Sequence, residues 1–468
     1  MEPLSSTSRL DVLKAANPWW TPPHRHDSPT LPPRPRPMAS LLIELISGGQ
    51  AVWLFGPRGT GKTVLVHQIL MRFLSKGLPA GNVCYLPCDH PALIHEEPDQ
   101  MLALWSQAVA GIVNTAMPRF LFVDVPMDHL PALSRLAVTP EAGVVMVIAS
   151  SCTPPALETN AETGARIRPL YLPPFTFPEY TSRAETPFGA RHENDELLVS
   201  PELISTLNQH FDNYLRLGGF PGATSQVFAS DALASLMPTT VMMNRSSISS
   251  SRELWDLMLV LAREDGNQVS PEWLAQATGL AKNTIRKYLT FLEETMVLRV
   301  VHRVNKWGAR LRRARSFRVF LAHPCMRYLL LGGTADAELL GHQSAGALMT
   351  QLPPSARLVE YAWSENGLGL AHLNPGRKLK TNERVAWAME VTQRDINLDP
   401  SDLVTFCRVH RLDRALMTTG SYFHFTQLNG VAVHQLPLSL QCYVLGYRLM
   451  FRKGLKITPV EDQPDPTD

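Results

Sequence analysis

The chain has 468 residues, of which 45% are apolar and 18% charged, and its 44 Lys and Arg outnumber its 42 Asp and Glu by two. This balance excludes a wholly disordered chain and leaves room for two to four domains of about 100–200 residues. No apolar run approaches the roughly 18–20 residues of a membrane helix, and the N-terminus lacks the layout of a signal peptide. Six dispersed cysteines are typical of reduced thiols, so we expect a cytoplasmic protein with no membrane partner.

Residues 1–37 form a proline-rich lead-in that holds nine of the 38 prolines. Proline removes a backbone donor and biases the preceding residue toward extended structure, so residues 21–37 are not expected to be helical. The segment is either a linker or an extended strap across a domain surface. Asn17, Trp19 and Trp20 favour the strap, because tryptophan side chains are rarely left in solvent.

Strands and helices alternate between residues 38 and 180. Helical periodicity is clearest over residues 63–75 and around 100–113. This alternation implies right-handed βαβ units and therefore an α/β domain with a parallel sheet. The expected strands are residues 51–55, 83–88, 120–124, 144–150 and 168–172.

The most specific motif is GPRGTGKT at residues 56–63, which fits the phosphate-binding pattern G-x-x-x-x-G-K-[ST] and lies between a predicted strand and a predicted helix. Its glycines let successive backbone N–H groups face the phosphates, and the helix dipole adds positive charge. Lys62 is expected to reach the β- and γ-phosphates, and Thr63 to offer its hydroxyl to Mg²⁺. The predicted nucleotide-binding residues here are Gly56, Pro57, Arg58, Gly59, Thr60, Gly61, Lys62, Thr63 and Val64.

A carboxylate for Mg²⁺ is expected where the 120–124 strand ends, at Asp124. ATPases of this class usually place a glutamate next, to polarise the attacking water, but residue 125 is valine. Asp128 lies one turn further on and is the candidate substitute, although a shorter side chain from another backbone position rarely puts a carboxylate in the same place. The predicted catalytic residues are Lys62, Asp124 and Asp128, and the predicted metal ligands are Thr63 and Asp124.

Two further polar residues are candidates for the γ-phosphate. Ser150 ends the strand predicted to flank the nucleotide strand, where it either senses the γ-phosphate or caps a turn. Arg166 lies in the loop that follows and either reaches the γ-phosphate, in cis or from a neighbouring subunit, or remains a solvated arginine.

Seven segments carry a wider likeness: NPWW (17–20), the phosphate loop, YLPCDHP (85–91), FLFVD (120–124), IASS (148–151), GARIRPLYLPPFTFPEY (164–180) and YLRLGGFPGA (214–223). Together they resemble the prokaryotic AAA-type P-loop ATPases in which the ATPase core is followed by a winged helix and a restriction-endonuclease-like domain of uncertain function. The resemblance implies an ASCE-type sheet, a helical lid, and ATP rather than GTP. It also implies that Asp124 is the Walker B aspartate and that Val125 replaces the catalytic glutamate.

Residues 251–320 are predicted to contain the winged helix. A short helix begins at Ser270 and closes in a glycine turn, and a second follows, with Lys282, Asn283, Arg286 and Lys287 as exposed candidates for the major groove. Residues 296–318 then carry eight Lys or Arg and no acid, Arg310, Arg312 and Arg313 among them, and would attract a phosphate backbone. The alternative is a lid or protein-docking module with a solvated basic face.

The remaining domains are a helical lid over residues 181–250, a degenerate α+β endonuclease-like domain over 321–457 and a disordered tail over 458–468. Metal-dependent cleavage would need an acidic residue followed two positions later by Lys. Glu390 is present, but Thr392 takes the place of the lysine, and the preceding strand GLGLAHL (367–373) has no carboxylate. We therefore expect no nuclease activity.

The sequence thus predicts an ATP- and Mg²⁺-binding switch with weak hydrolysis. Nucleotide would reposition the winged helix and so alter the binding of a nucleic acid or of a protein partner. The alternative is a non-hydrolysing nucleotide-dependent scaffold or DNA-binding adaptor.

Overall fold

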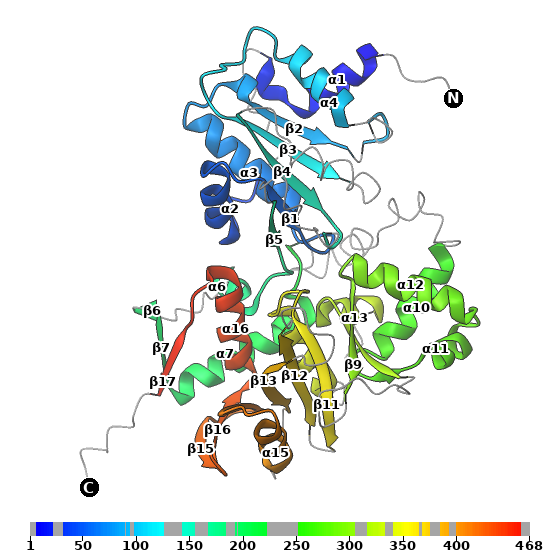
Figure 1. Cartoon of the computed structure of the whole chain (residues 1–468), viewed down its shortest axis with the longest axis vertical. Coiled ribbons are helices and arrows are strands. Elements are labelled where there is room, and N and C mark those ends of the chain that lie inside the picture. The colour runs from blue at the N-terminus through cyan, green and yellow to red at the C-terminus, as the bar shows by residue number, and fades with distance from the viewer. Residues whose placement is uncertain are drawn as a thin grey trace. The chain divides into compact units, whose positions relative to one another are not determined.

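The computed structural model divides into two compact units, Met1–Leu172 and Pro173–Asp468 (Figure 1). It describes residues 6–21, 31–88, 90–93, 98–125, 143–154, 167–183, 192–193, 195–221, 251–304, 316–332, 340–364, 367–374, 384–392 and 399–459. Within the described residues, the helices are too short or too polar to span a bilayer.

Unit 1 is built on a five-stranded parallel sheet with the order β2-β3-β4-β1-β5. All five predicted strands are confirmed, with bounds that differ by at most two residues, and so is the helix that follows the phosphate loop. The strands are β1 (Val52–Phe55), β2 (Val83–Pro87), β3 (Arg119–Val125), β4 (Val144–Ser150) and β5 (Arg168–Tyr171), and the helices are α2 (Met38–Ser47), α3 (Lys62–Ser75) and α4 (Pro98–Ala108).

The strand order places β4 between the strand that precedes the phosphate loop and the strand that ends near Asp124. This is the order expected of the ASCE class, and with the phosphate loop between β1 and α3 it identifies unit 1 as a P-loop NTPase fold. The strands are nearly continuous buried apolar runs, as in a parallel sheet covered on both faces.

The lead-in packs along the edge strand β2, and its first part is a helix, α1 (Ser6–Ala16), followed by a 3₁₀ turn, η1 (Pro18–Trp20). The Asn17 side chain bonds to both backbone groups of Tyr85, as a neighbouring strand would. Its Nδ2 donates to the Tyr85 carbonyl at 2.8 Å, and its Oδ1 accepts from the Tyr85 N–H at 2.7 Å. The indole N–H groups of Trp19 and Trp20 both donate to the Val83 carbonyl.

Unit 2 contains a nine-stranded mixed sheet with the order β15-β16-β14-β13-β12-β11-β9-β10-β8. Its helices are α6 (Phe177–Arg183), α7 (Pro201–Leu217), α10 (Ser251–Arg263), α11 (Pro271–Thr278), α12 (Lys282–Glu294), α13 (Pro324–Leu330), α14 (Leu340–Thr350), α15 (Ser401–Val409) and α16 (Leu438–Phe451). The strands of the large sheet are β8 (Gln268–Val269), β9 (Leu298–Arg303), β10 (Phe317–Leu321), β11 (Arg357–Ser364), β12 (Gly367–Asn374), β13 (Arg384–Val391), β14 (Arg414–Thr419), β15 (His424–Leu428) and β16 (Val431–Pro437).

This sheet joins two regions that the sequence predicted as separate domains. Strand β9, from the predicted winged helix, runs parallel to β11, from the predicted C-terminal domain, with Val359 opposite His302 and Glu360 opposite Arg303. A buried ion pair reinforces the junction: Arg318 on β10 is 3% exposed and Glu360 on β11 is 0% exposed, with Nη2 and Oε1 3.0 Å apart. Gln268 on β8 also donates to both Glu360 oxygens.

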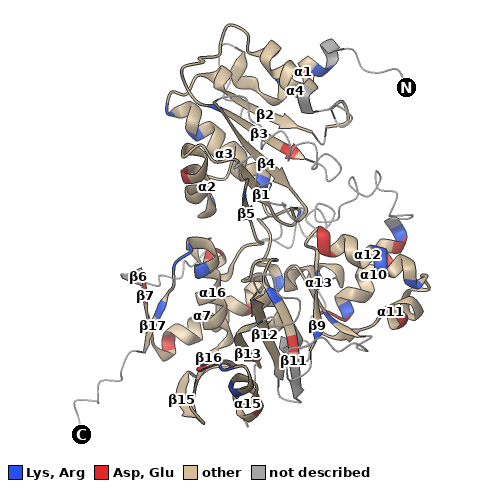
Figure 2. Ribbon diagram, viewed as in Figure 1, with Lys and Arg blue, Asp and Glu red and all other residues tan. Residues whose placement is uncertain are grey.

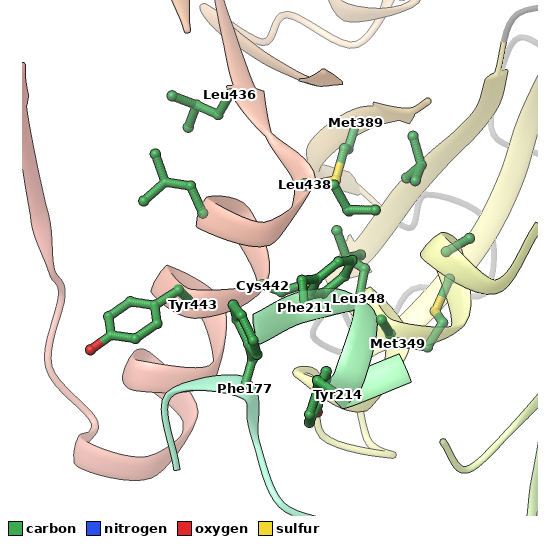
Figure 3. Packing of buried hydrophobic residues seen from close by; sticks show 14 of the residues in the cluster. Phe177, Phe211, Tyr214, Leu348, Met349, Met389, Leu436, Leu438, Cys442 and Tyr443 are labelled. Carbon is green, nitrogen blue, oxygen red and sulfur yellow. The ribbon is translucent and has the colours of Figure 1, made fainter. Parts of the chain in front are cut away.

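The main core of unit 2 includes α6 and α7, which the sequence assigned to the end of the ATPase domain and to the lid. Figure 3 shows Phe177, Phe211 and Tyr214 from these helices packed with Cys442 and Tyr443 from α16. The rings of Phe177 and Phe211 have centroids 5.1 Å apart, in an edge-on arrangement that favours aromatic pairs. The compact unit therefore begins at residue 173 rather than 181, and residues 222–250 of the predicted lid lie outside the described residues.

A small three-stranded sheet corrects the expected C-terminal boundary. Its strands are β6 (His192–Glu193), β7 (Glu196–Val199) and β17 (Lys456–Pro459), and β17 pairs with β7 in parallel. Thr458 and Pro459, assigned to the disordered tail, therefore form the end of a strand. Residues 460–468 lie outside the described part.

Candidate nucleotide site

The phosphate loop connects β1 to α3 at the carboxyl edge of the parallel sheet. Gly59 and Gly61 have φ values of 78° and 85°, a left-handed conformation that glycine adopts without strain. Gly61 is the N-cap of the 14-residue helix α3, and no side chain caps that end. The loop thus turns its backbone back on itself and presents the positive end of a long helix, the geometry of an anion site.

Lys62 is buried, with 6% of its surface exposed, and its ammonium is held by the loop itself. Its Nζ donates to the carbonyl oxygens of Gly56 and Pro57, both at 2.9 Å. Burial lowers the pKa of Lys62 to about 8, and the charge of Asp124 partly offsets this effect. The ammonium is therefore desolvated and loses its proton more readily than an exposed lysine, so a phosphate group would stabilise its charged form.

Thr63 and Asp124 meet at the end of β3. The Thr63 hydroxyl donates to Asp124 Oδ2 at 2.6 Å, and the Tyr85 hydroxyl approaches the same oxygen at 3.4 Å. The two predicted metal ligands are thus brought together, which is the arrangement that Mg²⁺ requires of the hydroxyl and carboxylate in this class. Val125 is buried and offers no acidic group.

Ser150 lies at the end of β4, but its hydroxyl already has two partners. Oγ accepts from the indole N–H of Trp53 at 2.8 Å and donates to the Cys152 carbonyl at 3.1 Å, and the side chain is fully buried. Its single proton is in use, so this geometry matches the turn-stabilising alternative better than the γ-phosphate sensor. Asp128 and Arg166, the other two candidates near the γ-phosphate, lie outside the described residues.

The remaining loop residues differ in exposure. Thr60 is buried and braces the loop by donating from Oγ1 to the Pro57 carbonyl at 2.9 Å, whereas Val64 is 37% exposed. Arg58 is partly buried. Two residues of the site were not predicted from the sequence. Tyr85 contacts Asp124, and Arg36 donates from its Nη1 to the Thr60 carbonyl at 2.8 Å. The only signal for Arg36 was its place between two prolines shortly before the domain.

The candidate nucleic-acid surface lies on α12, in unit 2. The helices predicted around a glycine turn are confirmed as α11 and α12: the Ser270 hydroxyl caps α11, and Gly279 ends it with a φ of 74°. Figure 2 shows Lys and Arg in blue, with Asp and Glu in red among them, over the helices α10 to α12. Lys282, Asn283, Arg286 and Lys287 are all exposed.

Two of the eight basic residues between 296 and 318 are not available to a phosphate backbone. Arg318 is in the buried ion pair with Glu360, and Arg299 donates to the carbonyl oxygens of Met349, Leu352 and Pro353. Expecting all eight to act as one basic surface was therefore wrong, because sequence does not reveal which arginines fold inward. Arg310, Arg312 and Arg313 lie outside the described residues.

Glu390 lies on β13, opposite Gly369 of β12, and both Glu390 and Thr392 are buried. Among the residues that the structure describes, no group of three or more His, Cys, Asp or Glu side chains is arranged to hold a metal ion.

Part of the chain matches one family model, and several solved structures are similar to it. A family model for a domain of unknown function, DUF8612, matches residues 208–337, and the comparison with curated proteins gave no match. Similar solved structures include the Orc1 protein of Aeropyrum pernix in complex with DNA (14% identity, 69% of this chain and 98% of that chain, TM-score 0.29) and Cdc6p from Pyrobaculum aerophilum (15%, 65% and 96%, TM-score 0.25). Drosophila ORC bound to DNA is a third (14%, 71% and 94%, TM-score 0.22). At such TM-scores the fold assignment rests on the strand order and the phosphate loop.

Proposed function

We propose that this chain is an ATP- and Mg²⁺-binding AAA-type protein that acts as a nucleotide-dependent switch with weak hydrolysis. The observation that carries the proposal is the meeting of a buried Lys62, a glycine-shaped loop and the Thr63–Asp124 pair at one edge of an ASCE-ordered sheet. These are the groups that hold the phosphates and the metal in P-loop proteins.

The residues present fit both ligands. Lys62 would transfer its donors from the loop carbonyls to phosphate oxygens, and the N–H groups of residues 56–64 would surround the phosphates. Thr63 and Asp124 would hold Mg²⁺, which would supply charge neutralisation at the phosphates. Asp128, Ser150 and Arg166 stay in the proposal as residues near the γ-phosphate, with Ser150 the weakest because its hydroxyl is already engaged.

Weak hydrolysis is proposed because Val125 cannot act as a base. A general base must lie within hydrogen-bond reach of the attacking water, and a buried valine provides no acceptor there. Nucleotide binding does not depend on that group, so the protein would be occupied by ATP for long periods.

The switch would act on unit 2 as a whole. Strands β9 and β11 share one sheet, and the Arg318–Glu360 pair lies buried between the winged-helix strands and the C-terminal strands. A winged helix built into such a sheet would not move alone. We therefore propose that nucleotide alters the binding of nucleic acid or protein by acting on the entire unit.

A second candidate is a non-hydrolysing, DNA-binding adaptor, which the exposed basic face of α12 favours. In either case, the C-terminal region would be a degenerate endonuclease-like domain. Its order of α14, three antiparallel strands β11–β13, α15 and the parallel strand β14 supports that relation. Glu390 is not followed by a lysine two residues later, as the nuclease pattern requires.

Steady-state phosphate release separates the two candidates. The assay compares the wild type with Lys62→Ala, with Mg²⁺ and ATP, in the presence and absence of duplex DNA. Slow release that the variant abolishes supports the switch. If the wild type releases phosphate no faster than Lys62→Ala, both with and without DNA, the switch is contradicted and the adaptor remains.

A further inference from the structure

Arg36 lies outside the phosphate-binding motif but is built into the site. It is 7% exposed, and its Nη1 donates to the carbonyl oxygen of Thr60 at 2.8 Å. Its place in the chain is fixed locally, because Pro35 and Pro37 restrict the backbone on both sides and the Ala39 N–H donates to the Arg36 carbonyl at 2.9 Å.

The segment that carries Arg36 is also attached to the helix that follows the loop. The side-chain amide of Gln68, on α3, donates to the Pro32 carbonyl at 2.7 Å. The segment from residue 32 to 37 therefore touches both the loop and α3, and the guanidinium is held by two prolines and a tertiary contact rather than by a flexible loop.

Arg36 contacts the peptide bond between Thr60 and Gly61, and the orientation of this bond decides which way the Gly61 N–H points. In a trans peptide the carbonyl oxygen and the following N–H point in opposite directions. When Arg36 holds the Thr60 carbonyl on its own side, the N–H of Gly61 is turned away from Arg36. Gly61 has a positive φ and is the N-cap of α3, so its N–H belongs to the set that a phosphate-binding loop presents.

We propose that Arg36 is a positioning residue of the phosphate loop, whose guanidinium fixes the Thr60–Gly61 peptide so that the Gly61 N–H faces the terminal phosphates of a bound nucleoside triphosphate. This inference rests on the proposed function, since it concerns the same site. Thr60 is clamped from both sides, because its own hydroxyl donates to the Pro57 carbonyl. The role needs a donor at residue 36, and a fork-shaped, permanently charged one serves it better than an ammonium.

The test uses the full-length chain, with Arg36→Gln and Arg36→Lys as variants and Arg34→Gln as the matched control. Arg34 lies two residues earlier and is exposed, so its substitution removes the same charge from the same segment while Arg36 keeps its contact with Thr60. Isothermal titration measures the affinity for MgATP and for tripolyphosphate, and a thermal melt without ligand reports the stability of each variant.

We expect Arg36→Gln to lower the affinity for MgATP and for tripolyphosphate by about tenfold or more, because a hydrogen bond from a charged donor is lost. Arg36→Lys should recover part of that loss, and Arg34→Gln should bind as the wild type does. The ligand-free melting temperature of Arg36→Gln should fall only by the cost of one buried hydrogen bond. Equal binding by Arg36→Gln and the wild type would overturn the role of Arg36 alone. If Arg36→Lys restores the melting temperature but none of the lost affinity, the role is overturned as well. If the wild type binds neither ligand, the proposed function fails too.

Discussion

Gly56 packs so tightly against the carbonyl oxygen of Leu172 that a Cβ at residue 56 would lie 2.1 Å from that oxygen. Leu172 also donates its N–H to the Phe55 carbonyl at 2.7 Å, so the backbone that leaves unit 1 is bound to the last residue of β1, directly before the phosphate loop. A change in the loop on nucleotide binding would therefore reach the residue that directly precedes unit 2.

Gly56→Ala is expected to displace the loop from Leu172, because the new Cβ is fixed to the backbone and would meet a backbone oxygen, so neither group can rotate away. Overpacking of this kind costs about 1–3 kcal/mol. The melting temperature of the ligand-free protein should fall, and ATP affinity with it. Gly77→Ala is a useful comparison, since its site is open and only its positive φ opposes the change. Wild-type affinity in Gly56→Ala would contradict the tight contact.

ATP affinity should decrease as pH rises above about 8. The pKa of Lys62 is lowered to about 8 by burial, so its charge is lost from the ligand-free protein as the pH rises through that value. Since phosphate binds the charged form, affinity should fall by up to about tenfold per pH unit in that range. Titrations between pH 7 and 10 test this.

Lys62→Arg provides the control for the pH series. Its guanidinium stays charged throughout, so binding should be weaker at pH 7 but should not change further between pH 8 and 10. A wild-type affinity that stays flat over this range would show that the Lys62 charge is not what holds the ligand.

Glu360→Gln is expected to destabilise the protein strongly, because it leaves Arg318 buried without its counter-charge. Breaking a buried ion pair from one side costs about 3–5 kcal/mol. The double variant Arg318→Met/Glu360→Met removes both charges and should recover much of that loss. Calorimetry of the full chain measures both effects, and Glu272→Gln, which breaks the exposed pair with Lys282, should change little.

Arg286→Ala/Lys287→Ala should weaken binding to a duplex DNA if α12 contacts the phosphate backbone. Two lost contacts would make the slope of log affinity against log salt shallower by about 2. Arg408→Ala/Arg448→Ala removes the same charge from exposed positions on α15 and α16 and is the matched control. An unchanged affinity and slope in the α12 variant would exclude this helix as the DNA contact.

The sequence predicted the local features of this protein well. The strands of unit 1 are short apolar runs and the phosphate loop has a fixed spacing, so both are visible in consecutive residues. The Thr63–Asp124 pair also followed, because parallel strands bring their carboxyl ends to one edge of the sheet.

The features that depend on distant parts of the chain could not be predicted. Nothing near Arg299 or Arg318 in the sequence distinguishes them from exposed arginines, since Pro353 lies 54 residues from Arg299 and Glu360 lies 42 residues from Arg318. The domain boundary at residue 172 likewise depends on the packing of Phe177 and Tyr214 with α16. Arg36 was missed because its role is a contact with a backbone carbonyl, which leaves no pattern.

The most direct test of the central claim is isothermal titration of MgATP into the full-length wild type and Lys62→Ala, each with and without EDTA. We expect the wild type to bind, EDTA to weaken its binding because Thr63 and Asp124 then have no metal to hold, and Lys62→Ala to lose at least about tenfold in affinity. Equal affinity in the two proteins, or no binding by the wild type, would contradict it.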